Sequence, residues 1–437
     1  MPITTSNTVI AKGWLRFEYY APRIRHLVLV PEDINEDLIS ILELYSRYRP
    51  LLTNLTSLEW GSCFSTPPIS SLMVVHFMGM SLRRLLIIFP LSTSSPHGAV
   101  EVLSTLKERT PLLERLEVKG LLDVDVANAV FNAALSLPQL STFHTEYFTI
   151  RMVHLIPLAQ LNHLRRISLA LDENTHFINS TAAFTPTFHS LETVNLTTTT
   201  LSYATNFILR FLLETPLREF TLAYCHLSNQ EDIVHLSSAM SQALPHSLMT
   251  TIRVWDEESA GSPLGDHAYA LDVSTLQKLF VFSDLEVFTF NITMDYGAID
   301  NNLIGDLVAH WPALRALSLV PTGRTPCPVV SLPLEGLIHF TKCRNLIYLN
   351  VLFDGSNIWS QHPARNGSSC PSLRYLDVHA SPLTFRDLNT LASLISDIFP
   401  NLIGGIKSLE PSIEEDSAER AMLWSIVTGR YNLLVQT

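Results

Sequence analysis

The sequence predicts an α/β solenoid in which a short parallel strand and a helix alternate along almost the whole chain. Two observations support this fold class. Leucine-type residues recur with the spacing L-x-x-L-x-L, as in residues 113–118, and the segments between these matches carry apolar residues one helical turn apart, as in residues 33–47. One strand and one helix cannot bury their apolar faces alone, so stacked neighbours must share a core.

The leucine-type positions form a ladder with a nearly constant period. The first position of each match is, in order, Ile24, Leu55, Leu82, Leu113, Leu140, Leu164, Leu191, Leu217, Met249, Leu285, Leu314, Leu346, Leu373 and Leu402. The mean step is about 29 residues, at the upper end of the range of leucine-rich repeats. We therefore predict about 14 leucine-rich repeats over residues 22–410, in a horseshoe with a concave parallel sheet and helices on the convex side.

Helices are predicted between the strands. They cover residues 33–47, 99–109, 124–134, 204–214, 232–243 and 386–398. In five repeats a proline stands two residues before the opening leucine, and it ends the preceding helix because it cannot continue one. Two repeats are weak: Thr145 takes an inward position in one, and Gly404 and Gly405 disturb the register of the last.

Capping segments are expected at both ends, because terminal repeats lack a neighbour that would cover their core. Residues 1–21 are predicted to cap the first repeat with an amphipathic helix that is rich in aromatic side chains. Residues 411–437 are predicted to cap the last repeat with a helix that runs to about residue 428, opened by a capping box of Ser412 and Glu415.

Two segments depart from the repeat period. Residues 256–266 are acidic and lie in the longest step, and residues 354–369 replace a helix with glycine, proline and serine. Each segment is either a binding loop or a plain connection, and the sequence leaves both interpretations open.

Composition argues against several classes of partner and compartment. A net charge of −12 argues against a nucleic-acid backbone as the main partner. Five cysteines without a C-x-x-C pair predict neither a disulfide framework nor a zinc site. The first residues do not resemble a signal peptide and no uninterrupted apolar stretch is long enough to span a membrane, so we expect a cytoplasmic or nuclear protein that does not act at a membrane.

No catalytic or metal site is predicted. The chain has no G-x-G-x-x-G, G-K-[ST], H-E-x-x-H or G-x-S-x-G motif. Its sixteen histidines lie at least nine residues apart, whereas a helical pair of metal ligands needs a spacing of about four. We therefore expect no enzymatic activity, no cofactor and no bound metal.

The candidate binding surface is the concave face of the sheet. Side chains alternate across a strand, so positions +3 and +5 after the opening leucine point into the core, and positions +2, +4 and +6 line the concave face. For the best-placed repeats these surface residues are Arg115, Glu117, Lys119, Thr142, His144, Glu146, Thr251, Arg253, Trp255, Tyr348, Asn350, Tyr375, Asp377 and His379. Tryptophan, tyrosine and arginine are enriched in binding hot spots, so Trp255 with Arg253, Tyr348 and Tyr375 suggests a protein-binding patch. The alternative is that Trp255 folds down against the acidic segment 256–266.

Two features resemble a known family. Cysteine stands eight residues after the opening leucine at Cys63 and Cys225, and the first strand is preceded by a segment of the form W-x-R-F-x-x-Y-A-x-R-I-R-x-L, made by Trp14, Arg16, Phe17, Tyr20, Ala21, Arg23, Ile24, Arg25 and Leu27. The chain resembles fungal F-box/leucine-rich-repeat proteins in its repeats and in the linker that joins them to the F-box. A purely structural interpretation is that Trp14, Phe17 and Tyr20 lie on an amphipathic helix that covers the core of the first repeat.

The resemblance implies a non-catalytic substrate-recognition region of a ubiquitin-ligase receptor, with a protein partner. An F-box needs about forty residues, and only thirteen precede Trp14. We therefore expect that docking on the ligase adaptor is missing. The alternative function is a leucine-rich scaffold, or a regulator of an enzyme such as a small GTPase, unconnected to ubiquitination. In either case we expect a monomer.

Overall fold

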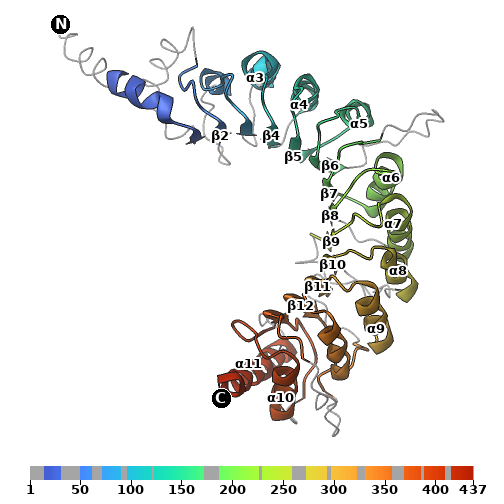
Figure 1. Cartoon of the computed structure of the whole chain (residues 1–437). Helices are drawn as coiled ribbons and strands as arrows, with labels where there is room; N and C mark the ends of the chain where they lie inside the picture. The colour runs from blue at the N-terminus through green and yellow to red at the C-terminus, as the bar shows by residue number, and fades with distance from the viewer. Residues whose placement is uncertain are drawn as a thin grey trace. The chain divides into compact units, whose positions relative to one another are not determined.

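The computed structural model of the chain describes residues 14–30, 50–61, 71–89, 96–120, 123–171, 187–225, 229–257, 272–292, 297–321, 330–356, 369–384, 388–408 and 415–436. The chain divides into two compact units, Met1–Leu191 and Glu192–Thr437. Within each unit, strands and helices alternate along the sequence, and the helices lie on one face of the sheet (Figure 1).

The first unit contains a parallel sheet of six described strands in sequence order. They are β1 (His26–Leu29), β2 (Ser57–Gly61), β3 (Arg84–Ile88), β4 (Arg115–Lys119), β5 (Thr142–Thr149) and β6 (Arg166–Leu171). The helical segments between them are η3 (Ser71–His76), α3 (Pro96–Arg109), α4 (Val124–Ser136) and α5 (Met152–Ala159).

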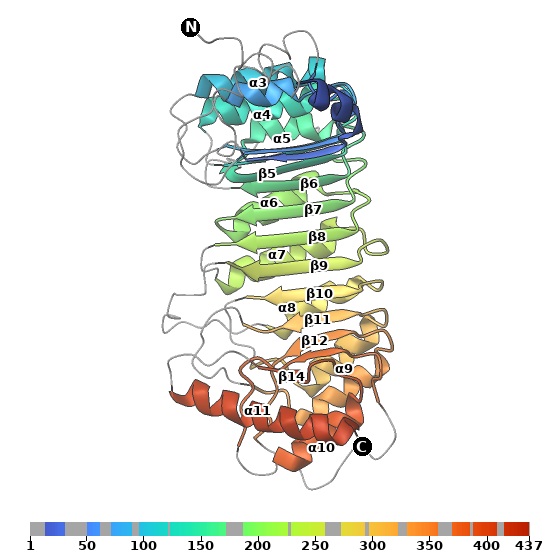
Figure 2. The same ribbon diagram turned by 90° about the vertical axis from the view of Figure 1, so that its left-hand side faces the viewer.

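The second unit repeats the arrangement with eight described strands. They are β7 (Thr193–Thr198), β8 (Glu219–Tyr224), β9 (Thr251–Asp256), β10 (Val287–Asn291), β11 (Ala316–Leu319), β12 (Tyr348–Val351), β13 (Tyr375–Asp377) and β14 (Ile406–Lys407). Its helical segments are α6 (Leu201–Phe211), α7 (Gln230–Ala243), α8 (Val273–Gln277), η4 (Lys278–Val281), α9 (Asn301–His310), η5 (Leu334–Lys342), α10 (Leu388–Ile398) and α11 (Glu415–Gln436). Figure 2 shows strands β7–β10 in front of helices α6, α7 and α8.

The predicted fold class, a leucine-rich-repeat solenoid, is confirmed. Thirteen of the fourteen strands in the described residues begin two residues after the opening position of a repeat. The exception is β14, which begins four residues after Leu402 because Gly404 and Gly405 both have a φ of 77°. Few side chains tolerate that left-handed backbone, so the glycines break the register here.

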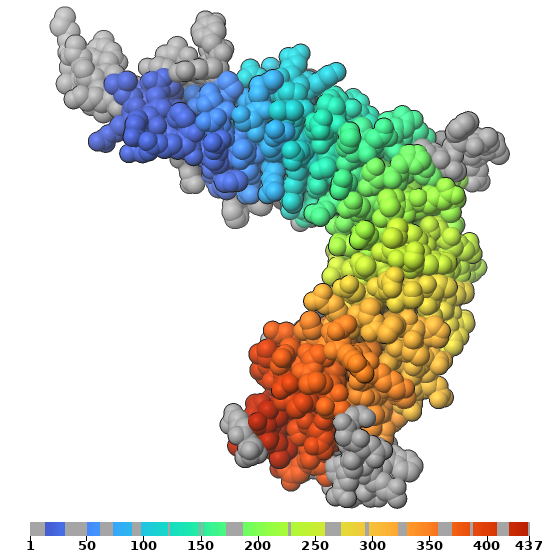
Figure 3. All heavy atoms as spheres, in the orientation of Figure 1, coloured from blue at the N-terminus to red at the C-terminus, as the bar shows by residue number. Residues whose placement is uncertain are grey.

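The core lies between each sheet and its helices. In β4 the inward positions, Leu116 and Val118, are fully buried, and they alternate with more exposed residues on the other face. The weak repeat keeps this pattern: Thr145 is buried, and its hydroxyl donates to the carbonyl of Ser168, 3.3 Å away. Each fully buried leucine contributes about 1.5–3 kcal/mol. The stacked leucines therefore hold neighbouring repeats together, and within each unit the atoms of successive repeats pack in sequence order (Figure 3).

Helices α4, α7, α8 and α9 begin at polar side-chain caps. The side chain of Asp123 accepts from the N–H of Val126, 2.8 Å away, at the start of α4. A capping box formed by Asn229 and Asp232 opens α7. Such caps satisfy backbone donors that would otherwise lack partners. The predicted helices at 99–109, 124–134, 204–214, 232–243 and 386–398 correspond to α3, α4, α6, α7 and α10.

Several predicted segments lie outside the described residues. They are the helix at 33–47, most of the two segments at 256–266 and 354–369, and residues 412–414 of the predicted capping box. The expectations for these segments stay predictions.

Residues 14–20 are helical and lead through the 3-10 turn η1 (Ala21–Arg23) into β1. Trp14 and Phe17 are half-buried with ring centroids 4.9 Å apart, and Ala21 is buried. Tyr20 differs from the expectation, because it is 55% exposed and does not cover the first repeat.

The C-terminal helix α11 packs on the last repeat. The hydroxyl of Tyr431 donates to the carbonyl of Phe399 at 2.7 Å, and the hydroxyl of Thr428 donates to the carbonyl of Ile406 at 3.1 Å. Trp424 and Tyr431 are almost fully buried. Among the described residues, no helix has both the length and the apolar character needed to cross a membrane.

Candidate functional site: the open face of the sheet

The face of each sheet that the helices leave uncovered, termed the open face, carries the residues at positions +2, +4 and +6. β4 and β5 pair in parallel without a register shift, so equivalent positions of these two repeats lie side by side: Glu117 beside His144 and Lys119 beside Glu146. Residues about 27 positions apart in sequence thus form rows across the strands, about 4.8 Å apart.

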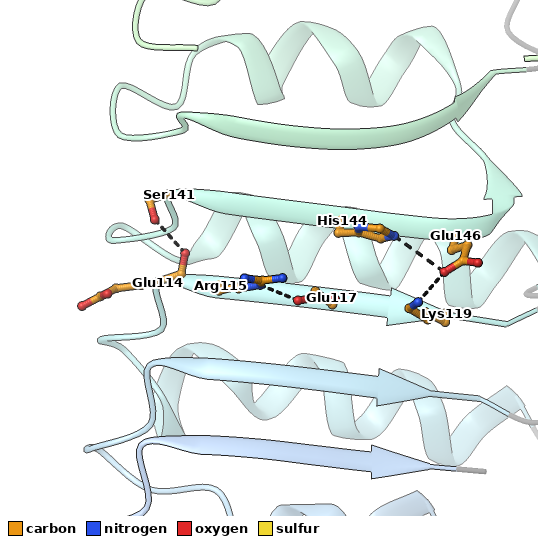
Figure 4. Close-up of polar contacts among 7 residues, drawn as sticks. All are labelled: Glu114, Arg115, Glu117, Lys119, Ser141, His144 and Glu146. Atoms are coloured by element: carbon orange, nitrogen blue, oxygen red, sulfur yellow. Dashed lines mark hydrogen bonds and ion pairs between the residues drawn. The ribbon is translucent and has the colours of Figure 1, made fainter. Parts of the chain in front are cut away.

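In the first unit, five predicted residues come together as a charged cluster: Arg115, Glu117, Lys119, His144 and Glu146. Figure 4 shows this cluster on β4 and β5. Lys119 Nζ lies 2.6 Å from Glu146 Oε2, and His144 Nε2 lies 3.7 Å from the same oxygen. Arg115 forms an ion pair with Glu117 on its own strand. The cluster therefore contains paired charges of both signs.

His144 is held in its neutral form. Burial lowers the pKa of His144, the positive charges of Lys119 and Arg115 lower it further, and Glu117 and Glu146 oppose the change. Its Nε2 is buried and, within the described chain, lacks a hydrogen-bond partner. A neutral imidazole in this position adds no charge to the cluster.

In the second unit, Arg253 and Trp255 are half-buried on β9. Trp255 lies beside Ala223 on one side and Asn291 on the other. Thr251 at the start of the same strand is buried, so its predicted exposure was wrong. Of the acidic segment 256–266, only residues 256 and 257 are among the described residues. The alternative that Trp255 folds against this segment therefore stays a prediction.

A ladder of uncharged polar groups continues from Trp255 across three strands. Ser318 Oγ donates to Asn291 Oδ1 at 2.9 Å, and Asn350 Nδ2 donates to Ser318 Oγ at 3.1 Å. Asn350 is only 7% exposed, so its predicted place on the surface was also wrong: its side chain is used to connect neighbouring strands. Asn291 and Ser318 stand at positions +6 and +4 of their repeats, and the repeat pattern alone could have found them.

The last predicted group surrounds the end of β13. Tyr375 is 41% exposed, whereas Asp377 and His379 are half-buried. Asp377 Oδ1 accepts from the backbone N–H of His379 at 2.9 Å, and this bond supports the left-handed φ of 47° at His379. Burial lowers the pKa of His379 while Asp377 opposes this change. Burial raises the pKa of the Tyr348 hydroxyl, and the negative charge of Asp377 raises it further.

Besides Thr142, Thr251 and Asn350, the other eleven candidate residues fall into two groups, one in each unit. Five form the charged cluster on β4 and β5, and six lie on β9, β12 and β13 or just after β13, namely Arg253, Trp255, Tyr348, Tyr375, Asp377 and His379. In the part of the chain that the structure describes, no three histidine, cysteine, aspartate or glutamate side chains gather as metal ligands. The surface supplies ion pairs, amides and aromatic edges.

The candidate residues come from only five repeats, so open-face residues of the other repeats were missed. Arg84 and Arg166 begin β3 and β6 and are exposed. Val28 on β1 is 65% exposed. The same positional rule, applied to all repeats, would have identified these residues.

No protein-family model matches the chain, and a search of curated proteins finds no match either. Among solved structures, it is similar to an internalin (InlF) from Listeria monocytogenes, with 13% identity, 76% of this chain and 82% of that chain covered, and a TM-score of 0.33. It is also similar to TLR13 in a complex with ssRNA13, with 13% identity, 83% of this chain and 58% of that chain covered, and a TM-score of 0.33.

Proposed function

We propose that the chain is a non-catalytic protein-binding module that holds a protein partner on the open face of the sheet. The observation that carries this proposal is the contrast between the two faces. Helices and buried leucines occupy one face, whereas the other presents aromatic, amide and charged side chains on a backbone fixed by strand pairing. Rigid presentation of such residues lowers the entropy that is lost when a partner binds.

The strongest anchors lie in the second unit. Trp255 and Tyr375 combine a large apolar area with few rotatable bonds, and both point to the open face. Their neighbours Arg253 and Asp377 supply charges of opposite sign. We infer that this group contacts the partner.

Alanine variants test this site. Trp255→Ala and Tyr375→Ala should each weaken capture of a partner at least tenfold, while the far-UV circular dichroism spectrum stays unchanged. Leu209→Ala is the matched control, because it removes an exposed apolar side chain from α6 on the helix side of the same unit. If both open-face variants capture the partner as well as Leu209→Ala does, the site is not here.

The resemblance of residues 14–27 to the linker of fungal F-box/leucine-rich-repeat proteins extends the proposal. On this basis, the module is the substrate-recognition region of a ubiquitin-ligase receptor. A captured partner should then be degraded faster in cells that contain the chain fused to an F-box than in cells that contain the chain alone, and a proteasome inhibitor should remove the difference. An unchanged lifetime would reject the ligase role and leave the binding module in place.

A further inference from the structure

The edge of the first unit at which its strands begin carries a run of arginines, of which only Arg115 belongs to the charged cluster described above. This run, termed the basic row, comprises the residue before each of β1–β6 and the first residue of the strand. Its charged or titratable members are Arg25, His26, Arg83, Arg84, Glu114, Arg115, Arg165 and Arg166. Six arginines and one glutamate give a net charge of +5 with the histidine neutral, in a chain whose net charge is −12.

The same positions in the second unit carry no excess charge. For β7–β14 they contain three arginines and three glutamates: Arg218, Arg315, Arg374, Glu192, Glu219 and Glu286. Arg315 and Glu286 also form an ion pair at 3.4 Å. The positive charge is therefore specific to the first unit and does not follow from the repeat architecture.

The basic row is continuous in space. Strand pairing places Arg84 beside Arg115, and Thr142 lies between Arg115 and Arg166. Backbone hydrogen bonds of 2.8 Å extend the pairing to the preceding residues, as from the N–H of Glu114 to the carbonyl of Arg83. Figure 4 shows Glu114 and Arg115 at the start of β4. Five steps of about 4.8 Å give the row a length of about 24 Å.

Part of this charge has no ion-pair partner among the described residues of the unit. Arg84 and Arg166 are exposed, and neither forms an ion pair with another residue of the described chain. Arg83 shares its charge with Glu114 at 3.4 Å and donates to the carbonyl of Leu112. Such an exposed pair is worth about 0–1 kcal/mol, so a better-placed carboxylate can replace Glu114.

We propose that the basic row binds an extended acidic segment of the protein partner. Aspartate and glutamate carboxylates accept two parallel hydrogen bonds from a guanidinium group, which makes arginine well suited to recognise them. An extended chain advances about 3.4 Å per residue, so the row accommodates about seven residues. Because the rest of the protein is acidic, its field repels such a segment elsewhere and favours this edge. The inference rests on the proposed function, since it assigns chemistry to one part of the partner.

The experiment measures fluorescence anisotropy of a labelled heptaglutamate peptide with the full chain at 50 mM NaCl. The test variant combines Arg84→Ala, Arg115→Ala and Arg166→Ala. The control variant combines Arg218→Ala, Arg315→Ala and Arg374→Ala, which removes the same number of arginines from the same edge of the second unit. A second test variant changes only Arg84 and Arg166, because Arg115 also pairs with Glu117 and its loss could disturb the fold.

We expect the triple test variant to lose at least tenfold in affinity for heptaglutamate and the double variant at least threefold, with the control unchanged. Binding should also weaken at 300 mM NaCl, because salt screens exposed charges. Equal loss in test and control variants, or no saturable binding at 50 mM NaCl, would overturn the proposal. Tighter binding of a thymidine heptanucleotide than of heptaglutamate would assign the row to nucleic acid instead.

A negative result in this experiment can be distinguished from failure of the proposed function. The peptide probes only the basic row, whereas Trp255→Ala and Tyr375→Ala probe capture of the whole partner in the second unit. Normal capture combined with no peptide binding would reject the basic row alone.

Discussion

The junction between α11 and the last repeats depends on Trp424. Its indole N–H donates to the carbonyl of Ser381 at 3.0 Å, and its ring meets Phe353 edge-on with centroids 5.7 Å apart. Trp424→Phe keeps an aromatic ring but leaves that buried carbonyl without its donor, at a cost of about 1–3 kcal/mol. The smaller ring leaves a void that adds about 1 kcal/mol. We therefore expect a loss of about 2–4 kcal/mol.

The loss should be local, because each repeat of a solenoid contacts only its neighbours. Hydrogen exchange measured by mass spectrometry reports such local opening. A loss of about 2–4 kcal/mol corresponds to exchange about 30- to 700-fold faster, and we expect this in β13 and α11. Strands β2–β4 in the first unit should exchange at the wild-type rate.

Met422→Ala serves as the control, since Met422 lies on the same helix but is exposed. It should change exchange in α11 by less than about twofold, because surface substitutions usually change stability by less than about 0.5 kcal/mol. Wild-type exchange in β13 and α11 of Trp424→Phe would refute the role assigned to the indole. Equal acceleration in β2–β4 would refute the local character of the opening.

Two further predictions concern Gly120, compared with Gly404 of the second unit, and His154. Gly120→Ala should lower the free energy of unfolding by at least about 2 kcal/mol in urea titrations, because Gly120 has a φ of 128° and a Cβ would lie 2.5 Å from the carbonyl oxygen of Phe89. Gly404 has a φ of 77° and no heavy atom within 4 Å of an added Cβ, so Gly404→Ala should lower the free energy of unfolding by only about 1–2 kcal/mol. Equal losses in the two variants would contradict this account. Burial lowers the pKa of His154 in the folded state, and the positive charge of Arg151 lowers it further. As the pH falls, the unfolded chain therefore binds the proton first, and stability that is present at pH 7 is lost toward pH 5. His154→Leu should reduce this dependence of the melting temperature on pH in thermal melts, and an unchanged dependence would show that His154 does not contribute.

The local rules of the sequence were sufficient for the fold and for the position of each candidate residue within its repeat. Leucine spacing located thirteen strands, each of which begins two residues after the opening leucine-type position of its repeat. The same rule placed Arg115, Glu117 and Lys119 on the open face. It gave which side of the sheet each residue faces, but not what lies beside it.

The sequence by itself determined the repeat, its period and the separation of core from surface, because these depend on residues within a few positions of one another. Tertiary structure decided which open-face groups are used internally. Asn350 is a surface position by its place in the repeat, yet Ser318, 32 residues earlier, accepts its amide N–H and contributes to its burial. The basic row arises in the same way, since arginines that are separated by whole repeats add their charges only when strand pairing stacks them at about 4.8 Å.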